Sequence, residues 1–142
     1  MLFDDAKVVN AESFATNAKA TVQRSGRLGL SREASTLLHV QKGGRLLIAM
    51  GDNGDFACVI LPPESTDLRG FRWQKASGYF SVNLKPFFDT IGLDYTNKEV
   101  TTIFDIVATE EHYGVYPVFK LHKRLVRRRL AKKQEGVDKF DV

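Results

Sequence analysis

The densest group of residues that could do chemistry is basic and lies near the C-terminal end of the chain. From residue 120 to residue 133 the sequence reads KLHKRLVRRRLAKK, with eight Lys or Arg and no Asp or Glu. The whole chain of 142 residues has a formal net charge of +4, so the rest of it is net negative. Concentrated positive charge of this kind attracts polyanions such as nucleic acid and anionic lipid.

The spacing of apolar residues in this segment predicts a helix. Leu121 and Leu125, and then Val126 and Leu130, recur four residues apart, with basic side chains in parallel rows beside them. Such a helix could contact nucleic acid, lie on anionic lipid, or only keep the chain solvated. The lipid role has least support, because the apolar seam carries no Trp or Phe. The candidates for nucleic-acid contact here are Lys123, Arg124, Arg127, Arg128, Arg129 and Lys132.

Residue patterns typical of catalysis or metal binding are missing from the sequence. The three histidines are widely separated, and no serine or cysteine forms a recognisable pattern with a histidine base. Several acids fall in predicted turns, where local hydrogen bonding accounts for them. Cys58 is the one cysteine and has no partner for an internal disulfide. We therefore predict that the protein is not an enzyme, with no catalytic residues, no metal and no cofactor.

Composition places the chain among ordinary globular proteins. It is 43% hydrophobic and 27% charged, and no window approaches the roughly 18 to 20 apolar residues that a membrane helix needs. The opening stretch MLFDDAKVVN has acids where a secretory signal would have bases. A single cysteine also suits a reducing compartment. These features predict a cytoplasmic protein that does not act at a membrane.

Local patterns predict the same series of elements twice. In residues 20–61 a Ser-Gly turn joins two short strands, Ser31 caps a helix, and a GDNG turn joins two further strands. In residues 71–121 the order repeats with a second Ser-Gly turn, and Asn83 takes the place of Ser31. Aligning the two turns brings Leu28 opposite Phe80, a period of about 52 residues. Residues 62–70 then form a linker, residues 1–19 an N-terminal segment, and residues 122–142 a basic helix and tail.

These patterns together predict the fold class. We expect an α+β, β-rich protein made of two tandem ββαββ repeats of swapped-hairpin type, followed by a basic C-terminal helix. A homodimer is a further expectation, because hairpin edges left open by such repeats would gain hydrogen bonds from pairing.

The first of the two repeats carries a family resemblance. The stretch SGRLGLSREASTLLHVQKGGRLLIAM resembles the AbrB and MraZ superfamily of swapped-hairpin transcription factors. The resemblance lies in the turn Gly26-Arg27, the short strand after it, the cap Ser31, and the helix end Leu38-His39-Val40. It implies that basic residues near the turns meet DNA, and it assigns that role to Arg24, Arg27, Arg32 and Arg45, with Lys42 as a further candidate.

The predicted function is nucleic-acid binding. Double-stranded DNA is the favoured form, with a role in transcription regulation or in organising the nucleoid. A protein-interaction or structural module, in which the basic tail only solvates the chain, is the alternative. A second alternative is single-stranded nucleic-acid binding through the rings of Phe71, Trp73 and Tyr79, since exposed aromatic side chains stack on bases.

Overall fold

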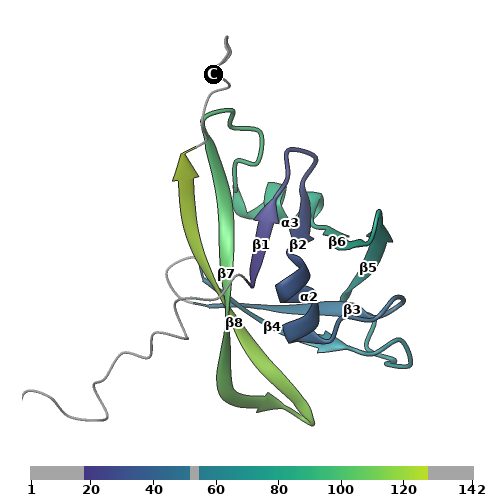
Figure 1. Cartoon of the computed structure of the whole chain (residues 1–142). Coiled ribbons are helices and arrows are strands. Elements are labelled where there is room, and N and C mark those ends of the chain that lie inside the picture. Colours follow the sequence, from purple (N-terminus) through teal and green to yellow (C-terminus); the bar gives the residue numbers. More distant parts are fainter. Residues whose placement is uncertain (1–17, 52–54, 128–142) are drawn as a thin grey trace, which may run out of the picture.

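The structure is a computed structural model that describes residues 18–51 and 55–127 (Figure 1). Two strands, a helix and two strands follow one another, and the same series then recurs. The first series is β1 (Lys19–Val22), β2 (Arg27–Leu30), α2 (Arg32–Leu38), β3 (Arg45–Met50) and β4 (Phe56–Leu61). The second is β5 (Phe71–Ala76), β6 (Tyr79–Asn83), α3 (Lys85–Ile91), β7 (Val100–Tyr113) and β8 (Tyr116–Arg127).

The eight strands form one closed antiparallel barrel. Around the barrel the order is β1-β2-β6-β5-β3-β4-β8-β7, and β7 pairs with β1 to close the ring. Hairpin neighbours in sequence therefore alternate with pairs from distant parts of the chain, namely β2 with β6, β3 with β5, β4 with β8, and β1 with β7. Figure 1 shows the long β7–β8 hairpin running along one side of the barrel. A closed ring of this kind leaves few unpaired strand edges.

This architecture corrects the predicted fold class. The α+β fold of two swapped-hairpin repeats is wrong, because all described strands join a single barrel, to which the two helices, of seven residues each, add little. Turn and capping signals act over a few residues, so they indicate which elements form and in what order. Which strand edges meet depends on contacts between residues far apart in sequence, and those signals do not report such contacts.

The predicted C-terminal helix is also wrong where the structure describes it. Strand β8 continues to Arg127 and pairs with β7 as far as Val100. A spacing of four residues places two side chains on one face of a strand as well as on one face of a helix. Leu121 and Leu125 therefore share one face of β8. Leu121 is buried in the barrel, and Leu125, farther along the same strand, is 65% exposed. Residues 128–142 lie outside the described part of the chain.

The core is built from inward-facing side chains of every strand. Alternate residues of each strand point into the barrel, such as Leu28 on β2, Val82 on β6 and Phe104 on β7. Helix α2 begins as predicted, because the Ser31 hydroxyl accepts a hydrogen bond from the Ala34 amide at 3.1 Å. The same hydroxyl accepts from the Lys19 amide at 3.1 Å, which ties the start of α2 to β1.

The second helix begins one residue later than predicted. Its N-cap is Leu84 rather than Asn83, and Leu84 makes no side-chain capping bond. The Asn83 side chain instead accepts a hydrogen bond from the Lys85 amide at 3.1 Å. A proline at the first turn, Pro86, helps α3 start without the usual cap.

Candidate nucleic-acid interface

The predicted basic residues fall into three places. Arg24 is exposed in the β1–β2 turn, and Arg27 and Arg32 begin the next two elements, β2 and α2. Arg45 begins β3. Lys123, Arg124 and Arg127 lie on β8, while Arg128, Arg129 and Lys132 are outside the described residues.

A groove on the outside of the barrel collects part of this first group. It has a volume of about 690 Å³ and runs over the outer faces of β1, β2, β6 and β5, which we call the groove face. Outward residues form a continuous row across these strands, since Thr21 pairs with Gly29, Gly29 with Ser81, and Ser81 with Gln74. The residues that line the groove are Lys19, Thr21, Gln23, Arg27, Gly29, Leu30, Ser31, Gln74, Ala76, Tyr79, Phe80 and Ser81.

The groove combines two basic side chains with amides and hydroxyls. Lys19 and Arg27 both line it, and no Asp or Glu of the described residues does so. The Arg27 guanidinium donates a hydrogen bond to the Gln74 side-chain oxygen, which holds it over the groove. Arg24 precedes Arg27 in the turn at one end, and Arg32 follows the groove residue Ser31 at the other. An anion that enters this groove therefore meets donors of hydrogen bonds and positive charge.

One carboxylate stands next to the groove. Asp105 on β7 is the register partner of Lys19 on β1. Its side chain is engaged, however, because Arg124 donates to it at 2.6 Å. The negative charge of Asp105 is therefore neutralised by Arg124 of β8 and not by a basic side chain of the groove.

Arg45 does not join the groove. Its guanidinium donates to the main-chain oxygen of Asp67 at 3.2 Å, and its Cβ lies close to Gly70. It thus holds the linker 62–70 against the start of β3. Arg72 on β5 is the register partner of Arg45. It is exposed, and it lies two residues from the groove residue Gln74 on the same side of β5.

The structure adds groove residues that sequence reasoning missed, among them Lys19, Gln74 and Ser81. For Gln74 a signal was present, since the alternation in FRWQKA places it on the side of β5 opposite Trp73. For Lys19 and Ser81 no local signal exists, because each acquires its place only when β1 and β6 flank β2.

Two of the four Lys and Arg side chains of β8, Lys120 and Arg124, are paired with acids. Asp55 lies 3.7 Å from the Lys120 ammonium and 3.5 Å from the His122 ring, and it accepts from the Lys123 amide at 3.3 Å. Burial acts to raise the pKa of the Asp55 carboxyl, but the Lys123 hydrogen bond and the neighbouring charges lower it overall. With Arg124 bound to Asp105, this part of the predicted basic patch offers less free charge than its sequence indicates.

Of the three rings considered for stacking on bases, one is available. Trp73 is 3% exposed in the core, and Phe71 packs against Phe87 with ring centroids 6.2 Å apart. Tyr79 is 52% exposed and lines the groove. The predicted set is therefore wrong for Phe71 and Trp73, because alternation along β5 turns both of them toward the barrel interior.

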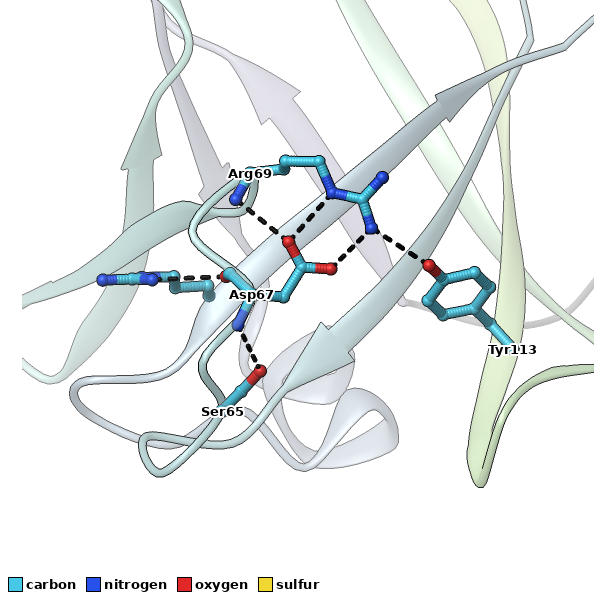
Figure 2. A network of polar contacts seen from close by, with 5 residues as sticks. Ser65, Asp67, Arg69 and Tyr113 are labelled. Atoms are coloured by element: carbon cyan, nitrogen blue, oxygen red, sulfur yellow. Dashed lines mark hydrogen bonds and ion pairs between the residues drawn. The ribbon is translucent and has the colours of Figure 1, made fainter.

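A second polar cluster lies away from the groove, where the linker meets the end of β7 (Figure 2). Arg69 forms a bidentate pair with Asp67 at 2.9 and 2.7 Å and also donates to the Tyr113 hydroxyl at 3.0 Å. The hydrogen bonds from Arg69 lower the pKa of the Asp67 carboxyl to about 2. Figure 2 also shows the Ser65 hydroxyl accepting from the Asp67 amide. The charges in this cluster satisfy one another.

Beside this cluster is an apolar pocket of about 330 Å³. Its floor is the outer face of β3 and β4, and its rim includes Arg69 and Tyr113; we call this side of the barrel the pocket face. Cys58 also lines it, and burial raises the pKa of that thiol to about 12. A thiol of this kind is a poor nucleophile. The pocket lining is Leu47, Ile48, Ala49, Ala57, Cys58, Val59, Arg69, Glu111, His112, Tyr113 and Val118.

The described residues contain neither a metal cluster nor a membrane-spanning helix. No group of three or more His, Cys, Asp or Glu among residues 18–51 and 55–127 is placed to hold a metal ion. In the same part of the chain, neither helix has the length and apolar character needed to cross a membrane.

Comparison with models of protein families, with curated proteins and with solved structures finds no match to this chain.

Proposed function

We propose that the protein binds nucleic acid in the cytoplasm through the groove face. The observation that carries this proposal is the groove itself, where Lys19 and Arg27 stand among amides and hydroxyls with no described carboxylate in the lining. Phosphate oxygens accept strong, charge-assisted hydrogen bonds from ammonium and guanidinium groups. Arg24 and Arg32, at the two ends of the groove, extend the positive charge along the path that a nucleic-acid backbone would follow.

Binding of this kind is tolerant of base sequence. Phosphate contacts position a nucleic acid but do not read it, and reading a duplex in the major groove requires an inserted helix or ribbon. Both helices have only seven residues. Double-stranded DNA, and with it a part in transcription regulation or nucleoid organisation, remains the form favoured by the sequence. Any polyanion satisfies the charge argument equally well.

A salt titration tests the proposal. The double variant Lys19→Gln/Arg27→Gln should lower the slope of log affinity against log salt by about 1.4 to 1.8, since each lost phosphate contact removes roughly 0.7 to 0.9. The matched control is Lys98→Gln/Lys120→Gln, which removes the same charge outside the groove lining and should leave most of the slope in place. Equal slopes for the two double variants would contradict the proposal. So would the absence of binding by the unmodified chain at about 50 mM salt.

A truncated chain measures the contribution of residues 128–142. Truncation after Arg127 keeps β8 whole, whereas truncation after Leu121 would remove half of the strand and its pairs with β7. Removing residues 128–142 should lower the slope of log affinity against log salt relative to the full chain. The denaturation midpoint should stay near that of the full chain. A slope unchanged by this truncation would assign the binding to the groove alone.

A protein-interaction module is the second candidate function. It is favoured by the apolar pocket and by exposed apolar side chains on the segments around it, namely Met50, Leu68 and Val115. A partner or a second copy of the chain would cover these side chains. Light scattering across a concentration series tests the homodimer, and a constant monomer mass at high concentration would remove it.

A further inference from the structure

We infer that the groove takes a single strand of nucleic acid and that one base stacks on Tyr79. This inference rests on the proposed function and names the form of nucleic acid that the groove fits. It replaces the three-ring platform expected from the sequence with one ring set beside two basic side chains.

The position of the basic side chains favours a single strand. Lys19 and Arg27 are partly buried on the walls of a hollow, and Gly29 between them contributes no side chain. A duplex carries its phosphates on the outside of a wide, stiff cylinder, so it most easily contacts basic side chains that stand out from a surface. A single strand is thin and flexible, and it can lie down in a groove and follow its floor.

The β1–β2 hairpin offers no free ribbon for a duplex groove. Its turn is held to the start of α3, because the Gly26 oxygen accepts from the Leu84 amide at 3.1 Å. A Cβ built on Gly26 would lie 2.5 Å from the Lys85 Cβ, so the turn and the helix are in close contact. Gly26 in this turn is therefore packed against the start of α3, while Arg24 beside it stays exposed.

The surroundings of Tyr79 leave its ring open for stacking. The β5–β6 turn has positive φ at Ser77 (53°) and Gly78 (82°), which suits a two-residue hairpin and sends Tyr79 outward and Phe80 inward. Directly across the hairpin from Tyr79 is Ala76, whose small side chain leaves space over the ring. The Phe80 ring, by contrast, is covered by the Lys75 ammonium at 5.3 Å. Tyr79 is thus the groove ring with a face open to a base.

The spacing of the basic and amide side chains also suits a single strand. Arg27 and Lys19 lie on opposite sides of the Gly29–Thr21 pair, four residues apart along the strands, which corresponds to about 13 Å. They can therefore contact two different phosphates of one strand. Gln23 and Gln74 lie in the same lining and offer amide donors and acceptors to base edges. Phosphate contact, stacking and adaptable hydrogen bonding are the elements of a single-strand groove.

The test compares a labelled twelve-nucleotide oligothymidylate with a duplex of the same length by fluorescence anisotropy. We expect the single strand to bind at least about tenfold more tightly than the duplex. Tyr79→Ala should weaken single-strand binding by roughly tenfold or more, and Tyr79→Phe should retain it, because stacking needs the ring and not the hydroxyl. The control is Tyr113→Ala on the pocket face, where the ring is similarly exposed at 48% against 52%; it should leave affinity within about twofold.

The outcomes separate this inference from the proposed function. Tighter duplex binding, or no effect of Tyr79→Ala while Lys19→Gln/Arg27→Gln still weakens binding, would overturn the single-strand inference and leave nucleic-acid binding in place. Binding of neither probe at low salt would end both. Circular dichroism of each variant shows whether the barrel is intact, so a loss of binding is not confused with unfolding.

Discussion

The groove face and the pocket face belong to the same barrel but use their outward side chains in opposite ways. On the groove face the outward row is polar, with Thr21, Gly29 and Ser81 in successive register positions. On the pocket face the outward pairs are apolar, Leu47 with Val59 and Ala49 with Ala57. Apolar side chains are stabilised when they are removed from water, so these outward pairs favour an element that covers them. The β7–β8 hairpin contributes to that cover through Tyr113 and Val118.

Charge distinguishes the two faces further. The Arg69 guanidinium beside the pocket is bound to Asp67 and Tyr113, so its positive charge is already neutralised within the protein. Among the residues that the structure describes, the partner of Arg27 in the groove is the uncharged side chain of Gln74. A basic side chain whose partner is neutral keeps its charge for a ligand. The comparison teaches that the number of basic residues in a region says less about anion binding than the partners of those residues do.

The largest expected effect tests whether the pocket face is closed. Burial raises the pKa of the Cys58 thiol to about 12, so the native protein should hold far less of the reactive thiolate than an exposed cysteine does. We expect an aromatic disulfide reagent to react with the native protein far more slowly than with the protein in denaturant. Rapid reaction in native buffer would show that the pocket opens to small molecules, and the contrast between the faces would weaken.

Two opposite substitutions between Val and Thr, one on each face, should show that the pocket face is more deeply buried than the groove face. Val59→Thr places a hydroxyl at a position that is 5% exposed and should lower the free energy of unfolding by about 1 to 3 kcal/mol. Thr21→Val on the groove face changes a half-buried position and should stay within about 0.5 kcal/mol. Urea denaturation of both variants gives the two values. Similar losses for the pair would mean that the two faces are equally covered.

A change on the groove floor should separate binding from stability. A Cβ on Gly29 would lie 2.5 Å from the Gln23 Nε2, the far end of a flexible side chain that can move aside. Gly29→Ala should therefore keep or raise stability by up to about 0.5 kcal/mol, since alanine suits a strand better than glycine. By narrowing the groove it should weaken nucleic-acid binding by about tenfold, or about 1.4 kcal/mol. Unchanged affinity would move the ligand off the groove floor.

The smallest expected effect is a pH dependence on the pocket face. The Arg69 hydrogen bonds lower the pKa of Asp67 to about 2 from 3.8 in the unfolded chain. A depressed carboxyl pKa stabilises the folded state above the unfolded pKa, and that stabilisation is lost as the pH falls from about 4 toward 2. Asp67→Asn should remove this part of the acid dependence of the denaturation midpoint. Because the pair is exposed to solvent, the change should be slight, and an Asn variant with the full wild-type acid profile would contradict it.

The sequence predicted local features well and long-range features poorly. The Ser31 cap and the Ser77-Gly78 turn depend on residues next to one another, and both occur as predicted. The barrel depends on which strand edges meet, and no pattern in residues 20–61 reports that β2 lies beside β6. The tail was mistaken for a helix because Leu121 and Leu125 satisfy the periods of helix and strand alike.

The residues of the candidate site also divide into those that local patterns predict and those that only the order of the strands brings together. Arg27 could be predicted because it stands in a recognisable turn. Lys19 and Ser81 could not, because they become groove residues only through the order of strands around the barrel. The pairing of Arg124 could not be predicted either, because its acidic partner, Asp105, is distant from it in sequence.

Amide chemical shifts recorded during titration with the single-stranded oligonucleotide test the central claim most directly, because they locate the ligand on the barrel. We expect the largest shifts on the groove face, at Lys19, Thr21, Gly29, Tyr79 and Ser81, while Ala49, Ala57 and Val59 on the pocket face stay unchanged. Shifts centred on the pocket face, or shifts that leave the groove residues unaffected when binding is complete, would contradict it.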